Sequence, residues 1–337
     1  MEAIIRFRGI VIADRAGPSH AKVWGSWKNI ARAAGIQAPR FPAIHFRWPT
    51  AALRDIVAPA MALLHTLGWD PLFLQRSALM WPLARAARWL QALRDWPSQA
   101  DFDALYAELT AHLQPPEPLR FVANVRKQDK RAHGAVVLDA LYDARIARFG
   151  EVPTRERDWH DVFNALCFAS FPRAKLALHR RQLAALERRL QDGLPKLPGA
   201  RTREHDALTL FDEGGVAVAA TAEAAAALAH AEPGPLPELL QQLEQAGAAR
   251  TVPFGHALFE HLVEGLVAPG GGTRVIVLDA LPDTPEALRN AVDAGLCQLL
   301  RDPQLFQSPK EQLHLRFGRM RMALPNAEAP DWAATAP

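Results

Sequence analysis

Cysteine is scarce in this chain of 337 residues, which holds only two, Cys167 and Cys297. Each lies inside an apolar run, and neither has a second cysteine or histidine at a metal-ligand spacing. Free cysteine in such runs behaves as a small hydrophobic residue. The pattern excludes a disulfide-rich miniprotein and gives no reason to expect an oxidising compartment.

Long hydrophobic runs are also missing. The longest uncharged apolar stretch, Ile56–Trp69, has 14 residues and includes a proline and a histidine. A membrane-spanning helix needs about 20 apolar residues, so we expect no membrane partner. Charged residues at positions 2, 6 and 8 are atypical of a secretory signal. We therefore expect a cytoplasmic protein.

No strong excess of charge of either sign is present, because 39 basic residues face 36 acidic ones. Seven of the basic residues are lysines and the rest are arginines, a bias typical of genome base composition. Nucleic-acid-binding proteins more often concentrate an excess of basic residues on one face. With 49% hydrophobic and 22% charged residues, the chain has the composition of a globular protein with a substantial core.

Several catalytic motifs are absent as well. The chain has no Walker A or dinucleotide-binding glycine pattern, since Gly270, Gly271 and Gly272 precede a predicted strand. It has no Gly-x-Ser-x-Gly turn, no His-Glu-x-x-His helix and no EF-hand loop. Nucleotide cofactors therefore have no support from motifs.

Helical periodicity covers most of the sequence. From Thr50 to Trp96 apolar residues recur at spacings of three and four, and three prolines divide this region into short helices. Further helices are predicted over 101–113, 135–149, 158–170, 172–192, 217–230, 239–246, 254–266 and 284–300. A buried strand is predicted over 274–278, and a β-hairpin from 206–212 and 216–218 around Glu213-Gly-Gly. The predicted class is α+β, predominantly α-helical with a small β-hairpin or sheet.

Capping residues indicate where several of these helices begin or end. Asp158 and Asp161 form a pair resembling a capping box, and Pro172 suits the first position of the following helix. Gly150 is a typical C-cap residue, and Thr284 caps the last predicted helix with a proline after it.

The chain is predicted to have three parts. Residues 1–50 are rich in Trp, Arg and Pro and are expected to be irregular, apart from a short strand at 4–12. Residues 51–322 are expected to form one compact domain. Residues 323–337, rich in Pro and Ala, are expected to be a flexible tail.

Two predicted helices carry a histidine and an oxygen-bearing partner one turn later. At 100° per residue, Asn164 lies 40° from His160, at the edge of an apolar stripe. Glu260 lies 40° from His256 in the same relation to its own stripe. If the two edges meet, His160, Asn164, His256 and Glu260 form a ligand set for a divalent metal ion such as zinc. Such pairs are more often plain hydrogen bonds between a helix and its neighbour, so a structural network is the alternative.

The predicted hairpin adds carboxylates. Asp206 and Asp212 share strand parity and would point to one side, where either could act as a general base for a bound water. Ordinary turn chemistry is the alternative, and it is favoured for Glu213.

The helix over 172–192 carries six basic residues: Arg173, Lys175, Arg180, Arg181, Arg188 and Arg189. These residues could form a phosphate-binding or RNA-binding face. The alternative is the solvated face of an amphipathic helix whose buried stripe contains Leu176, Leu183, Leu186 and Leu190.

Four segments of the chain resemble the pattern of a known family. They are Arg157-Asp-Trp-His-Asp-Val-Phe-Asn-Ala-Leu, Phe171-Pro-Arg-Ala-Lys, Asp206-Ala-Leu-Thr-Leu-Phe-Asp-Glu-Gly-Gly and Phe254-Gly-His-Ala-Leu-Phe-Glu. The chain resembles the bacterial domain-of-unknown-function family 3025 over roughly residues 45–320. The resemblance implies an intracellular proteobacterial protein and implies no named activity.

Three hypotheses follow. The first is a metal-dependent hydrolase with His160, Asn164, His256 and Glu260 as ligands and Asp206 or Asp212 as base. The second is a non-catalytic binding or scaffold protein whose polar cluster is structural. The third is an RNA-associated protein. The oligomeric state lies beyond the sequence.

Overall fold

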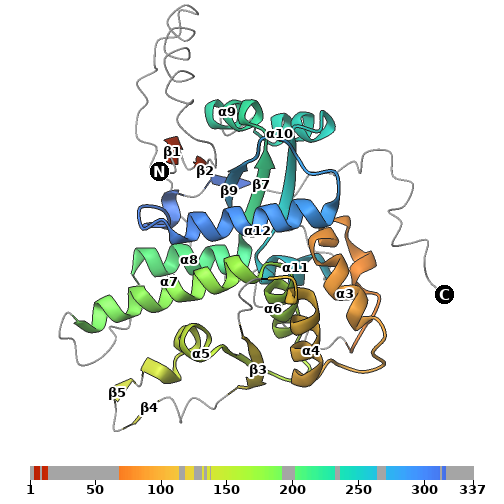
Figure 1. Ribbon diagram of the computed structural model, residues 1–337, viewed down its shortest axis with the longest axis vertical. Coiled ribbons are helices and arrows are strands. Elements are labelled where there is room, and N and C mark those ends of the chain that lie inside the picture. Colours follow the sequence, from red (N-terminus) through yellow and green to blue (C-terminus); the bar gives the residue numbers. More distant parts are fainter. Residues whose placement is uncertain are drawn as a thin grey trace, which may run out of the picture.

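The computed structural model of the chain describes residues 4–7, 10–13, 68–113, 118–124, 131–132, 135–136, 138–191, 202–231, 236–263, 271–311 and 313–315. These residues form an α+β fold in which helices predominate (Figure 1), as the sequence predicts. The helical pattern from Thr50 to residue 67 and the tail lie outside the described residues. The division into 1–50, 51–322 and 323–337 therefore stays a prediction.

A mixed sheet organises one half of the fold. Its strands run in the order β1 (Ile4–Phe7), β2 (Ile10–Ala13), β9 (Gly271–Val277), β7 (Val216–Ala220) and β8 (Ala249–Pro253), and β10 (Leu313–Leu315) pairs with β9. β9 is parallel to β2 and β7, whereas β7 and β8 are antiparallel. Every residue of β7 is buried, which is typical of a central strand covered on both faces.

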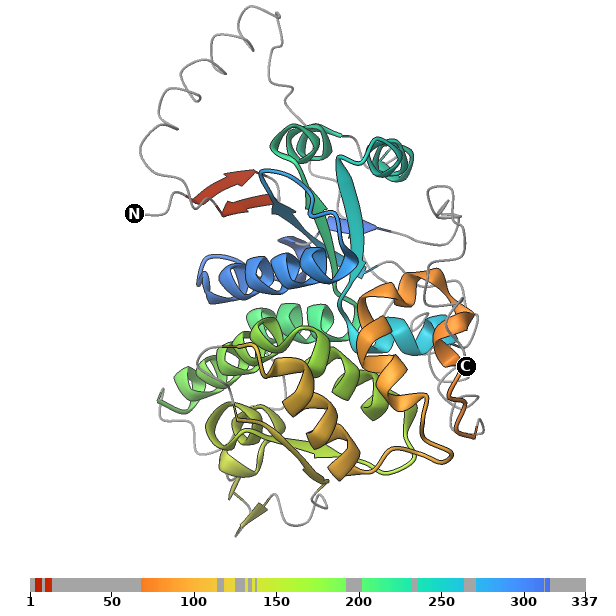
Figure 2. The same ribbon diagram turned by 45° about the vertical axis from the view of Figure 1, so that its right-hand side comes forward.

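Helices lie on both sides of this sheet (Figures 1 and 2). α9 (Ala222–His230) and α10 (Leu236–Gln245) lie on one side, and α12 (Pro285–Arg301) lies on the other. A Cβ atom at Gly295 would meet the side chain of Ile276 at 2.5 Å, so this glycine lets α12 approach β9 closely. α7 (Pro172–Gln191) packs along the far side of α12, next to α8 (Arg203–Gly214).

The second half is helical and surrounds α6 (Trp159–Ser170), which is buried along nearly its whole length. It contacts α11 (His256–Val263), α4 (Gln99–Thr110), α3 (Ala84–Leu90) and the 3₁₀ turns η1 (Phe73–Arg76) and η2 (Ala78–Leu83). Trp159 stacks on Trp69 with ring centroids 5.2 Å apart, and its edge contacts Phe73. This aromatic cluster fixes the first turn of α6, the turn that carries His160.

Several predicted helix ends are confirmed. The Asp158 side chain accepts a hydrogen bond from the Asp161 backbone N–H at the start of α6. α7 begins at Pro172, and Thr284 caps α12. Gly150 closes α5 (Tyr142–Phe149) with φ of 64°, the left-handed conformation that glycine favours. α5 starts later than the predicted helix over 135–149, because β5 (Ala135–Val136) and η4 (Leu138–Ala140) precede it.

Smaller strands complete the described fold. β3 (Arg120–Ala123) pairs in parallel with β6 (Glu151–Thr154), and β4 (Arg131–Ala132) pairs with β5. η5 (Pro309–Glu311) precedes β10. The strand predicted over 4–12 is present as two short strands, β1 and β2.

The predicted β-hairpin at 206–218 is wrong. Residues 203–214 form α8, capped by Thr202, and only the second predicted strand exists, as β7. Ala207, Leu208 and Phe211 are buried together because they share one face of a helix. β7 pairs with β8 and β9, which come later in the chain, and the predicted helix over 217–230 therefore starts only at Ala222.

Candidate metal centre

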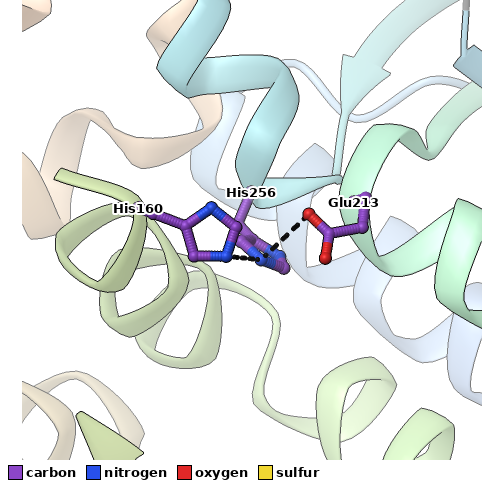
Figure 3. A group of neighbouring side chains, drawn as sticks. All are labelled: His160, Glu213 and His256. Atoms are coloured by element: carbon purple, nitrogen blue, oxygen red, sulfur yellow. Dashed lines mark hydrogen bonds and ion pairs between the residues drawn. The ribbon is translucent and has the colours of Figure 1, made fainter. Parts of the chain in front are cut away.

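Three side chains from three different helices converge beside α6 (Figure 3). His160 comes from the first turn of α6, His256 is the first residue of α11, and Glu213 lies in the last turn of α8. The Nε2 atoms of His160 and His256 are 3.0 Å apart, and Oε2 of Glu213 lies 3.4 Å from Nε2 of His256. One donor atom from each side chain lies within 4.8 Å of the other two.

A close backbone approach brings Glu213 to His256. The backbone N–H of Gly255 donates to the carbonyl of Gly215 at 2.9 Å, which joins the end of α8 to the start of α11. A Cβ atom at residue 255 would meet the carbonyl carbon and oxygen of Glu213 at 2.5 Å. Glycine at position 255 is therefore required for this contact.

The outer ring nitrogens of both histidines are already hydrogen bonded. Nδ1 of His256 lies 2.9 Å from the backbone oxygen of Asp212. A carbonyl oxygen only accepts, so Nδ1 carries the proton, and Nε2 of the neutral ring presents a lone pair. Nδ1 of His160 lies 3.0 Å from Oε2 of Glu260, a carboxylate acceptor. In their neutral forms both rings therefore direct lone pairs at each other, an arrangement that needs a proton or a metal cation between them.

The surroundings shift the pKa values of the two histidines in opposite directions. Burial lowers the pKa of His256 well below its ordinary value, and Lys175 and His160 add to this effect. Burial also opposes charge on His160, but the hydrogen bond to Glu260 and the charge of Glu213 outweigh it and raise its pKa. Burial raises the pKa of Glu213. The cluster therefore has one nitrogen base that stays neutral and one that attracts positive charge.

A buried ion pair between Lys175 and Asp212 lies next to the cluster. The Lys175 side chain is fully buried, and its Nζ contacts Oδ1 of Asp212 at 2.5 Å and Oδ1 of Asn164 at 2.9 Å. Nδ2 of Asn164 donates to the Tyr142 hydroxyl at 2.7 Å. Burial acts to raise the pKa of Asp212, but Lys175 and His256 outweigh it and hold that pKa well below its usual range. The carboxylate of Asp212 is therefore held as an anion beneath His256.

The predicted site residues take different places around the cluster. His160 and His256 face each other, as the helical wheels suggested they could. Glu260 lies behind His160, on its Nδ1, and Asn164 belongs to the Lys175 network. Asp212 supports His256 through its backbone oxygen.

Asp206 is not brought to the cluster. It is exposed near the start of α8, and no hydrogen bond joins it to the described site residues. Asp206 and Asp212 would share a side only on a strand, whereas on a helix they point in different directions.

Two residues of the cluster were missed by the sequence reasoning. The sequence pattern favours a turn at Glu213, because the residues before it also fit a strand. The same pattern places Lys175 on a solvated basic face. At 100° per residue Lys175 lies only about 20° from the buried Leu186, and this wheel position is the signal that its side chain can face inward.

The predicted basic face of α7 is therefore smaller than the sequence indicates. Lys175 is buried, and Arg181 reaches inward to the backbone oxygens of Leu300 and Asp302. Arg181 and Arg188 both pair with Glu204 of α8. Leu176, Leu183 and Leu186 are buried, as predicted for the apolar stripe.

Comparisons with known proteins give a family and no activity. A family model described as "Protein of unknown function (DUF3025)" matches residues 120–326. This range covers the cluster and more than half of the chain, but it begins later than the resemblance from residue 45 suggested. No curated protein and no solved structure matches the chain. Among the described residues, none of the helices is long and apolar enough to cross a membrane. The chain belongs to the DUF3025 family of proteins of unknown function.

Proposed function

We propose that the chain binds one divalent metal ion, of the zinc class, through Nε2 of His160, Nε2 of His256 and the carboxylate of Glu213. The observation that carries this proposal is the pair of Nε2 atoms 3.0 Å apart, with each Nδ1 already hydrogen bonded. Two histidines and one glutamate are a ligand set of catalytic zinc sites, which keep a further position open.

The distances support the proposal. Two ligands on one tetrahedral zinc ion, at bond lengths of about 2.0–2.1 Å, lie roughly 3.3 Å apart. The separations of 3.0 Å and 3.4 Å from His256 Nε2 to the other two donors are close to this value. The partners of the outer nitrogens support it as well, because metal-bound histidines usually donate their second N–H to a carboxylate or a backbone carbonyl. Glu260 and the Asp212 carbonyl fill these two roles.

The reaction class that fits best is metal-assisted hydrolysis. A bound divalent cation lowers the pKa of a coordinated water and polarises an ester, amide or phosphoryl oxygen. The Glu213 side chain is 42% exposed and the His160 side chain 21%, so a substrate can approach from their side. Neither predicted base is placed for that role, because Asp206 is exposed elsewhere and the Asp212 carboxylate is engaged by Lys175.

Elemental analysis of the untagged protein, purified without chelator, tests the proposal. We expect about one zinc, manganese or iron ion per chain, lost in the His256→Ala variant while the circular dichroism spectrum is retained. His230→Ala, an exposed histidine at the end of α9, is the matched control and should keep the metal. A protein without metal that takes up none on titration would overturn the ligand assignment.

The raised pKa of His160 favours a second candidate, a purely structural cluster. A proton on Nε2 of His160 would satisfy the lone pair of His256, and Glu260 and Glu213 would balance the charge. The chain would then be a binding or scaffold protein. In that case His160→Ala should lower the melting temperature of metal-free protein, whereas for a metal centre the loss should be large only when metal is present.

The bacterial source, the cytoplasmic location and the absence of a nucleic-acid partner stay predictions from the sequence. An RNA-associated protein should bind RNA with an affinity that falls steeply with salt.

A further inference from the structure

A separate cavity lies at the other end of α6. It has a volume of about 200 Å³ and is formed where the ends of α4 and α6 meet the start of α7 and the middle of α12. Its lining residues include Leu109, Ala169, Ser170, Arg289 and Asp293. Ser170 is ten residues beyond His160, which is about 15 Å along a helix. The cavity is therefore distinct from the candidate metal centre.

Two residues that line this cavity each carry a buried polar atom without a hydrogen-bond partner among the described residues. Ser170 is 1% exposed, and its hydroxyl makes no hydrogen bond. Arg289 is 5% exposed, and its Nε also lacks an acceptor. A buried donor without a partner is costly, so native structures usually provide a protein group, a water or a ligand for it.

The guanidinium of Arg289 is poorly balanced by the residues around it. Its Nη2 donates to the Asn290 side chain at 3.0 Å and lies 3.6 Å from Glu286, whose side chain is 51% exposed. Arg173, an exposed residue at the start of α7, also lines the cavity. Glu286 also pairs with Arg85, so the buried guanidinium shares an exposed counter-charge, which favours an anion beside it.

Asp293 does not supply the missing counter-charge for Arg289, because its carboxylate caps the start of α7. Its carboxylate accepts from the backbone N–H of Arg173 at 3.3 Å and of Ala174 at 2.8 Å, and so caps α7. Burial raises the pKa of Asp293 to about 7, so near neutral pH it carries only part of a negative charge. The N–H groups at the start of α7 are therefore already bonded to Asp293, and the groups that still lack a partner belong to Arg289 and Ser170.

We propose that this cavity binds a small carboxylic acid anion, with its carboxylate on Arg289 and Ser170 and a short apolar body against Leu109, Leu113 and Ala169. The volume admits roughly six to eight non-hydrogen atoms, judged against the ~30 Å³ that one water occupies in the liquid. The apolar part of the lining favours a carboxylate with a short carbon chain over inorganic phosphate.

Calorimetric titration with butyrate tests this site, with butyramide as the uncharged analogue. We expect one saturable site for butyrate and none for butyramide. Arg289→Gln should weaken butyrate binding at least tenfold, and Ser170→Ala should weaken it several-fold. Arg301→Gln, an exposed arginine on the same helix outside the cavity, should bind like the wild type. Because Arg289→Gln could also unfold the chain, Ala169→Leu provides a second variant that fills the cavity and should abolish binding.

Three outcomes would overturn the proposal. The first is no saturable binding of butyrate by folded wild-type protein. The second is equal binding of butyrate and butyramide, which would remove the role of charge. The third is binding of inorganic phosphate at least as tight as that of butyrate, which would leave an anion site without the apolar body.

Discussion

His160 and His256 each use one ring nitrogen to fix the ring and direct the other toward a shared point. The fixed nitrogens contact Glu260 and the Asp212 carbonyl at 3.0 and 2.9 Å. Such contacts select the tautomer in which Nε2 is free to bind a cation. In this account Glu260 orients a ligand and is not itself one.

Replacing Glu260 should therefore weaken metal binding without removing it. Glu260→Gln keeps the size of the side chain but removes its charge, and loss of an orienting partner typically lowers metal affinity about 10- to 100-fold. Competition for zinc against a chelating dye measures the change. Glu238→Gln, an exposed glutamate on α10, should have no effect. An unchanged affinity in Glu260→Gln would contradict the orienting role.

The side chain of Lys175 contributes to the stability of the fold. Its ammonium is fully buried and holds Asp212 and Asn164 together. Lys175→Met would leave the buried Asp212 carboxylate without its cation, which typically lowers the free energy of unfolding by about 3–5 kcal/mol. The double variant Lys175→Met/Asp212→Asn should recover a large part of that loss, because no buried charge is left unpaired. Urea denaturation gives the comparison, and a loss below about 1 kcal/mol in Lys175→Met would contradict the role given to the pair.

Among the secondary-structure elements, the junction of α8 and α11 positions the candidate site. Glu213 reaches His256 because the backbone at Gly255 passes directly against the backbone of Glu213. The last turn of α8 and the first residue of α11 thus act as one unit, although more than 40 residues separate them in the chain.

Gly255→Ala should therefore affect both stability and the site. The added Cβ would overlap the Glu213 carbonyl group, so we expect a loss of about 2 kcal/mol or more in the free energy of unfolding and weaker metal binding. Gly214→Ala is the matched control, since a Cβ atom there would meet nothing within 4 Å. Thermal melting and metal titration of both variants provide the test. Equal behaviour of the two variants would argue against the junction.

The sequence was most informative where one helix carries its own signals. The limits of α6 follow from Asp158 and Pro172, and His160 lies at a partly buried helix edge as its wheel position predicts, whereas His256 is buried. The β-hairpin predicted at 206–218 is wrong because so short an apolar pattern fits a strand and a helix about equally well. The strand partners that decide the outcome for β7 lie far along the chain, in β8 and β9. Glu213 was missed for the same reason, because its approach to His256 is a tertiary contact.

For the whole molecule, the two proposed sites lie at opposite ends of α6 and have different electrostatics. The metal centre has an excess of carboxylates around two histidines, whereas the cavity has arginines around one buried aspartate. Asp293 interacts with Arg173 from α7 and Arg289 from its own helix, and His112, beyond α4, lines the same cavity. Its pKa, raised by burial to about 7 from an ordinary value near 3.9, links this cavity to the stability of the fold.

The raised pKa of Asp293 predicts that the free energy of unfolding falls as pH rises. Because the folded state holds the proton of Asp293 more tightly than the unfolded state, its contribution is fully present below about pH 4 and is lost as pH rises toward 7. Asp293→Asn removes the titrating group but keeps an oxygen acceptor for the helix end. The wild type should therefore lose about 2–3 kcal/mol relative to Asp293→Asn between pH 5 and pH 8. Urea denaturation across this range measures the difference, and a constant difference would contradict the raised pKa.

The central claim is that His160, His256 and Glu213 bind one metal ion, and X-ray absorption at the zinc edge tests it most directly. We expect nitrogen and oxygen ligands at roughly 2.0–2.1 Å, with outer-shell scattering from two imidazole rings that falls in His256→Ala. A wild-type protein that retains no zinc after reconstitution and dialysis would contradict the claim. So would a zinc spectrum that is the same in the wild type and in His256→Ala.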